Sequence, residues 1–387
     1  MYLRSEWIQR IEEAFDERSI VWLKGVRRVG KTVLCRSLPD AEYFDCELPR
    51  TRQLFEDPEG FLNDMRGKRI VLDEIHRLTN PSEVLKIAAD HYPNIQIIAT
   101  GSSTLGASEK FRDTLTGRKR TVWLTPMTLA DSRAFQQDNL THRLQRGGLP
   151  PFFLADSLPE SDYQEWLDSY WAKDIQELFR LERRASFQRL VELMAAQSGG
   201  IFEATRFAGP CEINRQTVTN YLAVLEATLV AHVVRPFSTR RSTELVSAPK
   251  VYAFDTGFVC YARGWHDLRP DDLGLLWEHF VLNEMQASLQ TQQIHYWRDK
   301  NKHEIDFVIR KRGGAPDAIE CKWSAGEFDP KNLLAFRRQY SHGKNWVVSA
   351  DVDQSYTRQV KGVEVRYVGL RGLVNELAAA ERIEGHL

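Results

Sequence analysis

The sequence predicts an α/β protein that begins with a parallel sheet, continues with a helical and winged-helix unit, and ends with a unit of element order αβββαβ. Two observations support this class. In the first part of the chain, short apolar segments alternate with helical segments, which is typical of a parallel sheet with crossover helices. At 387 residues the chain is also too long for one ordinary core. We therefore expect three domains, at residues 1–150, 151–270 and 271–387.

The composition is that of a folded, soluble chain, with 42% hydrophobic and 27% charged residues. Because the formal net charge is -1, any contact with nucleic acid has to come from local basic patches. The five cysteines are scattered without a CxxC, which argues against a disulfide framework or a zinc cluster and favours a reducing compartment. Charges interrupt the N-terminal segment, and no run of about 18 apolar residues occurs, so we expect a cytoplasmic protein without membrane contact.

Three apolar segments, at residues 19–24, 69–74 and 95–103, predict buried strands of the first domain. The first segment leads into "GVRRVGKT" and a helix at residues 31–38, which fits the pattern G-x-x-x-x-G-K-[ST] of a phosphate-binding loop. We expect Lys31 to reach the β and γ phosphates of ATP and Thr32 to bind Mg²⁺ through its hydroxyl. The expected nucleotide contacts are Gly25, Val26, Arg27, Arg28, Val29, Gly30, Lys31, Thr32 and Val33.

The second strand ends in two acids that complete this site. We expect Asp73 to hold Mg²⁺ through its hydration shell and Glu74 to polarise the attacking water, as a Walker B pair does. The third strand ends in "TGSS", where Ser102 or Ser103 would position water or sense the γ phosphate; a simple turn is the alternative.

Stabilisation of the transition state also calls for an arginine, which a neighbouring subunit often supplies. The segment "FRDTLTGRKR" offers Arg112, Arg118 and Arg120, and we select Arg118 as the residue that acts in trans. The alternative is a solvated basic loop. An arginine in trans implies a homo-oligomer.

The middle domain begins with helical segments at residues 162–181 and 185–200, and then shows the helix, strand, basic turn and strand of a winged helix between residues 212 and 254. In its helix, Val218, Leu222 and Leu225 are expected to face inward. The polar side chains of the opposite face and of the basic turn are candidates for DNA contact, with protein packing alone as the alternative. These candidates are Arg215, Gln216, Thr219, Asn220, Arg240 and Arg241.

The last domain carries polar residues on otherwise apolar strands. Its expected elements are a helix at 275–290, strands at 293–298, 304–311 and 317–323, a helix at 329–340, a strand at 345–350 and a final helix at 372–380. Period-two geometry places Glu320 and Lys322 on one face, and a hairpin would bring Asp306 beside them. Two carboxylates suit Mg²⁺ or Mn²⁺, and the lysine would stabilise developing charge. An ordinary salt bridge between Lys322 and Asp306 is the alternative.

Glu278, on the helix before these strands, would complete the cluster, with Glu284 two turns on as its rival. Cys321 points to the opposite face and is expected in the core.

The chain resembles prokaryotic AAA+ ATPases that combine a P-loop module, a winged helix and a C-terminal domain of unknown function with a restriction-endonuclease-like core. The motifs that carry the resemblance are "GVRRVGKT", "IVLDEIH", "TGSS", "GGLP", "PKVYAFDTGF", "WEHFVLNEM", "YWRDKNKHEIDFVI" and "AIECKWS". The last domain is similar to the PD-(D/E)xK nuclease superfamily, which includes archaeal Holliday junction resolvases. That similarity implies metal and catalytic roles for Glu278, Asp306, Glu320 and Lys322.

The resemblance implies an ATP-dependent DNA-processing enzyme: an oligomeric ATPase, a hexamer being one candidate, with a metal-dependent endonuclease domain that acts on double-stranded or branched DNA. Two other functions stay open. The chain could be an ATP-driven switch whose nuclease-like domain only binds DNA or a protein partner, or a signalling ATPase that never meets nucleic acid.

Overall fold

The computed structural model describes residues 3–101, 114–157, 159–176, 179, 183–239, 248–310 and 314–384. The chain forms two compact units that interleave along the sequence. The first contains Met1–Asp138, Leu149–Glu182 and Ala223–Val230, and the second contains Asn139–Gly148, Arg183–Leu222 and Ala231–Leu387. This partition differs from the three domains that we predicted with boundaries at residues 150 and 270, and those domains stay a prediction.

The first unit is built on a five-stranded parallel sheet of order β2-β3-β4-β1-β5. Its strands are β1 (Ile20–Lys24), β2 (Ala41–Asp45), β3 (Arg69–Asp73), β4 (Gln96–Thr100) and β5 (Lys119–Trp123). The three strands expected from apolar runs are present as the inner strands β1, β3 and β4. The edge strands β2 and β5 escaped prediction because they are only partly buried and contain charged residues.

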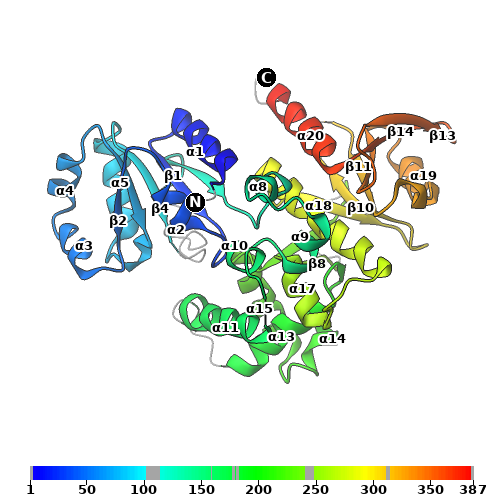
Figure 1. Ribbon diagram of the computed structural model, residues 1–387, viewed down its shortest axis with the longest axis horizontal. Coiled ribbons are helices and arrows are strands. Elements are labelled where there is room, and N and C mark those ends of the chain that lie inside the picture. The colour runs from blue at the N-terminus through cyan, green and yellow to red at the C-terminus, as the bar shows by residue number, and fades with distance from the viewer. Residues whose placement is uncertain are drawn as a thin grey trace. The chain divides into compact units, whose positions relative to one another are not determined.

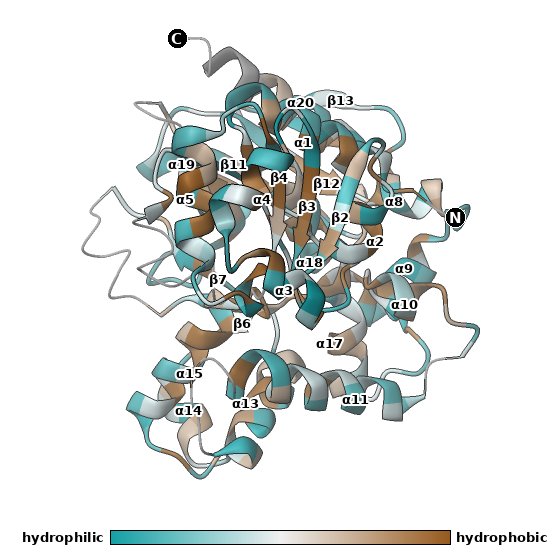
Figure 2. Ribbon diagram, turned by 90° about the vertical axis from the view of Figure 1, so that its left-hand side faces the viewer, coloured by the Kyte–Doolittle hydropathy of each residue, from teal (hydrophilic) through white to brown (hydrophobic). Residues whose placement is uncertain are grey.

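The core of this unit lies between the inner strands and the helices beside them. Ile20 and Trp22 of β1 pack with Leu72 of β3, and also with Phe61 and Leu85 of the helices α4 and α5. Figure 2 shows β3 and β4 as hydrophobic ribbons next to helices of mixed polarity. The helical segments of the unit are α1 (Ser5–Glu17), α2 (Lys31–Arg36), α3 (Pro49–Leu54), α4 (Pro58–Asp64), η1 (Ile75–Arg77), α5 (Pro81–His91), α8 (Leu129–Ala134), α10 (Pro150–Phe153), α11 (Glu160–Tyr170) and the π-helical η2 (Trp171–Gln176).

The second unit is built on a nine-stranded mixed sheet of order β13-β14-β12-β11-β10-β9-β7-β8-β6. Its strands are β6 (Gly200–Ile201), β7 (Ala231–Pro236), β8 (Lys250–Ala253), β9 (Ile294–Arg298), β10 (Glu304–Ile309), β11 (Asp317–Lys322), β12 (Asn345–Ser349), β13 (Tyr356–Val360) and β14 (Val363–Val368). Its helices are α9 (Leu140–Arg146), α13 (Arg184–Ala196), α14 (Ala204–Ala208), α17 (Thr256–Arg263), α18 (Pro270–Leu289), α19 (Lys331–Gln339) and α20 (Leu370–Glu384).

The predicted order αβββαβ is present in this unit as α18, β9, β10, β11, α19 and β12. Two helices cover opposite faces of its sheet (Figure 1). Val347 of β12 packs in a cluster with Phe336 of α19, whereas the adjacent Trp346 donates a hydrogen bond to Glu376 of α20 over 2.9 Å. Neighbouring residues of a strand point to opposite faces, so α19 and α20 enclose the sheet between them.

The predicted helix, strand, turn and strand occur as α15 (Arg215–Ala227), β7 and β8, and the two strands pair antiparallel. They do not form a sheet of their own. β7 also pairs parallel with β9, where Arg235 lies opposite His295, so the hairpin belongs to the nine-stranded sheet. The predicted winged helix stays a prediction, and its two strands are largely buried and continue into the C-terminal sheet.

The composition predicted reduced cysteines and no membrane-spanning segment. All five cysteines are free and buried. In the part of the chain that the structure describes, no helix is both long enough and apolar enough to cross a membrane.

Candidate functional site

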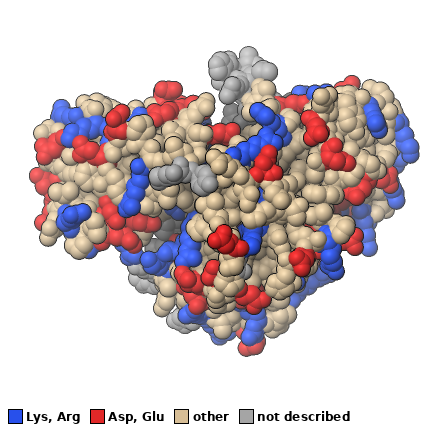
Figure 3. Space-filling model, viewed as in Figure 1, with Lys and Arg blue, Asp and Glu red and all other residues tan. Residues whose placement is uncertain are grey.

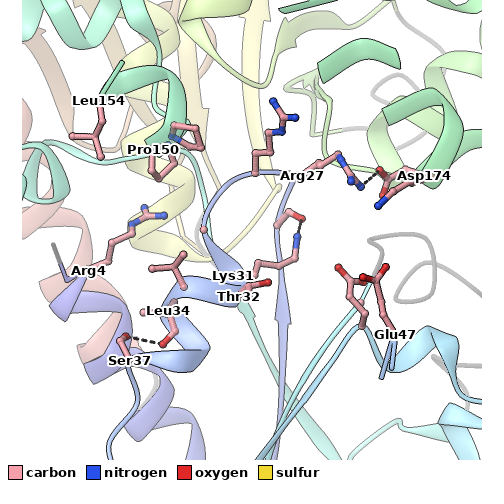
Figure 4. Close-up of a pocket in the computed structure, with 18 of the residues that line it drawn as sticks. Arg4, Arg27, Lys31, Thr32, Leu34, Ser37, Glu47, Pro150, Leu154 and Asp174 are labelled. Carbon is pink, nitrogen blue, oxygen red and sulfur yellow. Dashed lines mark hydrogen bonds and ion pairs between the residues drawn. The ribbon is translucent and has the colours of Figure 1, made fainter. Parts of the chain in front are cut away.

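The loop between β1 and α2 borders a cavity of about 570 Å³ in the first unit (Figure 4). Glycine is required at both ends of the loop. A Cβ on Gly25 would lie 2.5 Å from the backbone oxygen of Leu124, and Gly30 has φ +102°, which other residues rarely adopt. The predicted residues that line the cavity are Gly25, Arg27, Arg28, Gly30, Lys31, Thr32 and Val33. Val26 and Val29 are instead buried beneath the loop.

Lys31 is held at the loop by two neutral acceptors. Its Nζ donates to the backbone oxygens of Gly25, at 2.8 Å, and Val26, at 3.2 Å. A carbonyl oxygen carries only a partial charge, whereas a phosphate oxygen adds full ionic attraction to the hydrogen bond. A phosphate oxygen would therefore compete effectively for this ammonium group.

Thr32 and Asp73 lie together, as the two motifs require. The Thr32 hydroxyl donates to Asp73 Oδ2 over 2.8 Å, Tyr43 donates to the same oxygen, and Thr100 donates to Oδ1. A hydroxyl beside a carboxylate is a set of hard oxygen donors that fits Mg²⁺. Sequence reasoning missed Tyr43 and Thr100. Thr100 could have been found, since it ends β4 at the sheet edge where β3 also ends.

Glu74 follows β3 with a left-handed backbone of φ +53°. Its N–H donates to the Thr100 hydroxyl over 3.1 Å, and its carboxylate lies 3.2 Å from His76 Nδ1. Burial favours the neutral acid, but the hydrogen bond from His76 and the charges of Lys31 and Arg27 outweigh burial and lower the pKa of Glu74. The side chain is therefore an ionised carboxylate inside the cavity. A strained backbone of this kind is concentrated at functional sites.

One wall of the cavity is apolar. Leu3, Val33 and Leu154 line it although they are 45%, 51% and 47% exposed, and Pro150 and Pro151 lie beside them. Such a surface suits a flat apolar ligand group. Val33 was predicted because it follows the loop motif, whereas Leu3, Leu154 and the two prolines come to the cavity only through the tertiary structure.

Of the predicted arginines, Arg118 and Arg120 lie within the described residues. Arg118 forms a two-pronged ion pair with Asp90, with Nε to Oδ1 at 2.7 Å and Nη2 to Oδ2 at 3.0 Å. Arg120 lies 3.4 Å from Glu17. Neither residue lines the cavity of its own chain. The predicted Ser102, Ser103, Arg112, Arg240 and Arg241 lie outside the described residues.

The predicted DNA contacts on α15, which are Arg215, Gln216, Thr219 and Asn220, are all exposed. Beneath them, Val218, Tyr221 and Leu225 are buried, whereas Leu222, which we expected inside, is only partly buried. The buried face of α15 therefore includes Tyr221 where we predicted Leu222. On the face of the molecule in Figure 3, positive and negative side chains are interspersed.

In the second unit, Asp306, Glu320 and Lys322 meet. β10 and β11 pair antiparallel, with Phe307 opposite Ile319. Lys322 Nζ lies 3.0 Å from Glu320 Oε2 and 3.6 Å from Asp306 Oδ2. The structure thus brings the three predicted residues together, and the salt bridge that we gave as the alternative is also present.

Glu278 lies near this cluster but has other partners. Its Oε1 accepts hydrogen bonds from Lys250, at 3.2 Å, and from Tyr252. Lys250 also lies 2.6 Å from Glu304 Oε1. Burial and the negative charge of Glu278 raise the pKa of Asp306, against the opposite effects of Lys322 and Lys250. Sequence reasoning missed Lys250, whose signal is a lysine on the apolar strand "KVYA".

The ionised form of Glu320 is disfavoured by its surroundings. Burial and the nearby Asp306 raise its pKa to about 8, although Lys322 acts in the opposite direction. Among the described residues, its Oε1 is a buried atom without a hydrogen-bond partner. Two carboxylate oxygens fit a hard cation. However, no set of three or more His, Cys, Asp or Glu side chains in the described ranges is arranged to hold a metal.

Three segments of the chain match known domain families. Residues 17–132 match an AAA domain, residues 137–269 match a domain of unknown function (DUF8612), and residues 273–367 match another (DUF4143). The uncharacterised proteins Rv2008c of Mycobacterium tuberculosis and Mb2031c of Mycobacterium bovis are each 29% identical to the chain over 332 residues, which is 82% of this chain and 74% of theirs.

Solved structures with similarity include the Walker-type ATPase PABY2304 of Pyrococcus abyssi, with 17% identity and a TM-score of 0.45 over 68% of this chain and 96% of that one. AMPPCP-bound DnaA from Aquifex aeolicus has 12% identity and a TM-score of 0.29 over 56% of this chain and 86% of that one. The match to an AAA domain covers both the loop "GVRRVGKT" and the strand that ends in Asp73, so the family comparison and the cavity indicate the same site.

Proposed function

We propose that the chain is a P-loop ATPase that hydrolyses ATP in the cavity of its first unit. The observation that carries this proposal is the contact between the Thr32 hydroxyl and Asp73, with Lys31 and Glu74 lining the same cavity. Thr32 and Asp73 would hold Mg²⁺, which when bound would neutralise part of the phosphate charge.

Each side chain has a defined task in this proposal. Lys31 leaves the loop carbonyls and binds the β and γ phosphates, while the backbone N–H groups of the loop cradle them. Glu74, ionised at neutral pH, orients the attacking water and accepts its proton. Thr100 fixes the Glu74 backbone through its hydroxyl. Leu3, Val33 and Leu154 provide the apolar surface on which the adenine packs.

The test is phosphate release from ATP by purified protein, compared among the wild type, Lys31→Ala and Glu74→Gln. We expect turnover by the wild type only, with nucleotide binding lost in Lys31→Ala and retained in Glu74→Gln. A wild type that binds no ATP in the presence of Mg²⁺ would overturn the proposal.

We propose as a second candidate function that the cluster of Asp306, Glu320 and Lys322 binds Mg²⁺ or Mn²⁺ and cleaves DNA. The supporting observation is the buried Oε1 of Glu320, which lacks a partner among the described residues and would gain one from a cation. Asp306 and Glu320 would hold the ion, and Lys322 would have to release both carboxylates. The competing candidate is a domain that binds DNA or a protein partner without cutting.

A cleavage panel separates these candidates. Linear, forked and four-way DNA are incubated with Mg²⁺ or Mn²⁺, with and without ATP, using wild type and Asp306→Ala. Asp299→Ala is the matched control, because Asp299 pairs with His303 outside the cluster. Cutting that depends on Asp306 and not on Asp299 supports a nuclease, and intact DNA in every lane contradicts it.

Two proposals concern partners. We propose that the exposed face of α15 contacts DNA, in which case Arg215→Ala weakens binding and reduces its dependence on salt.

We also propose that the chain forms a homo-oligomer in which Arg118 reaches a neighbouring nucleotide site. Arg118→Ala should then lose ATP turnover but still assemble, as measured by light scattering. Full turnover by the assembled variant would contradict this proposal.

A further inference from the structure

The helix α11 and the π-helical turn η2 contact the phosphate-binding loop through two acids. Glu165 of α11 pairs with Arg28, and Asp174 of η2 pairs with Arg27 through Nη1 and Oδ2 at 3.5 Å. Trp166 adds a hydrogen bond from its Nε1 to the Arg27 backbone oxygen at 3.2 Å. The loop is therefore tied to this helical segment at neighbouring positions.

The two acids differ in their surroundings. The Asp174 side chain is 14% exposed and lines the cavity, whereas the Glu165 side chain is 64% exposed and does not line it. Figure 4 shows Asp174 directed at Arg27, on the same side of the loop as Lys31. An exposed ion pair is screened by water and salt, but a charge inside the cavity acts on whatever binds there.

The charges around Asp174 are those that a phosphate group would meet. Burial and the carboxylate of Glu74 raise the pKa of Asp174, while the cations Arg27 and Lys31 act in the opposite direction. A carboxylate thus already lies near the cations that the loop offers to a nucleotide. Phosphates that enter the cavity bring further negative charge toward Asp174.

We propose that Asp174 is an internal counter-anion that competes with nucleotide phosphate for Arg27 and Lys31. It balances the loop cations in the empty cavity and opposes the arrival of phosphates, so it limits nucleotide affinity. This inference rests on the proposed ATP site. It adds a residue outside the phosphate-loop motif that sets how tightly ATP and ADP bind.

The test measures the affinity of a fluorescent ATP analogue, and of ADP by displacement, for the full chain with Mg²⁺. Asp174→Asn removes the charge at nearly constant size, and Glu165→Gln is the matched control from the same helical segment. We expect Asp174→Asn to bind both nucleotides about tenfold more tightly. Glu165→Gln should stay within about twofold of the wild type, because exposed ion pairs contribute little.

The outcomes separate this inference from the function on which it rests. If the wild type binds and Asp174→Asn binds equally or more weakly, Asp174 positions the loop and the counter-anion role is wrong. If the wild type does not bind ATP, the proposed function itself fails. Thermal unfolding without nucleotide verifies that each variant is folded, and Asp174→Ala provides the same test if the asparagine variant does not fold.

Discussion

Replacement of Glu320 by glutamine should stabilise the protein, and increasingly so as pH rises. The folded chain holds the pKa of Glu320 at about 8 instead of its ordinary 4.5. Between these values the folded state keeps a proton that the unfolded state has lost, so stability falls as pH rises through this window and levels off above about 8. At 1.36 kcal/mol per pH unit, the full loss is on the order of 5 kcal/mol.

Glutamine resembles the protonated acid and does not ionise. The free energy of unfolding of Glu320→Gln should therefore not fall with rising pH for this reason. We expect the variant and the wild type to have similar free energies of unfolding near pH 5. At pH 8.5 the variant should be more stable by several kcal/mol, up to the roughly 5 kcal/mol estimated above. The assay is urea unfolding of nucleotide-free protein at both pH values, followed by tryptophan fluorescence. Glu364→Gln, at an exposed position of β14, is the control.

A stability difference that does not change between pH 5 and pH 8.5 would refute this reasoning. The same variant also reports on metal binding. A cation favours the ionised carboxylate and stabilises the state that binds it. Millimolar Mg²⁺ should therefore raise the melting temperature of the wild type at pH 8.5 and leave that of Glu320→Gln unchanged. Equal shifts in both proteins would exclude a cation at Glu320.

Three further predictions concern the first unit. Arg4 and Asp131 form a buried ion pair, 5% and 3% exposed, so Asp131→Ala should cost about 3–5 kcal/mol in urea unfolding. Asp90→Ala, which breaks the exposed pair with Arg118, should lower the free energy of unfolding far less, and a loss equal to that of Asp131→Ala would contradict this expectation. Thr100→Val removes the hydroxyl that bonds both acids at the end of β3, so phosphate release should fall about tenfold while nucleotide binding persists.

Sequence alone predicted the elements whose pattern is local. Apolar runs located β1, β3 and β4, because inner parallel strands are buried on both faces. The edge strands β2 and β5 lacked that pattern and were missed. Likewise, the loop motif identified Lys31 and Thr32, since glycines at fixed spacing shape a phosphate cradle independently of the rest of the chain.

The missed residues depend on contacts between distant segments. Tyr43 and Asp174 reach the proposed nucleotide site from β2 and η2, and no local pattern marks them. Thr100 reaches it from the end of β4, where its position beside the end of β3 was a usable signal. Lys250 reaches the carboxylate cluster because β8 joins the C-terminal sheet. β7 links the hairpin of β7 and β8 to this sheet by pairing with β9. The local hydrophobic pattern predicts which residues form a strand. Which strands pair with one another depends on the tertiary fold.

In the proposed function, Glu74 acts as the base of an ATP-hydrolysing site assembled by Lys31, Thr32 and Asp73. The most direct measurement is steady-state phosphate release by Glu74→Gln with Mg²⁺, beside its affinity for ATP. We predict that turnover falls by about 10²–10⁴-fold while the affinity stays within a few-fold of the wild type. Turnover equal to that of the wild type would contradict the claim.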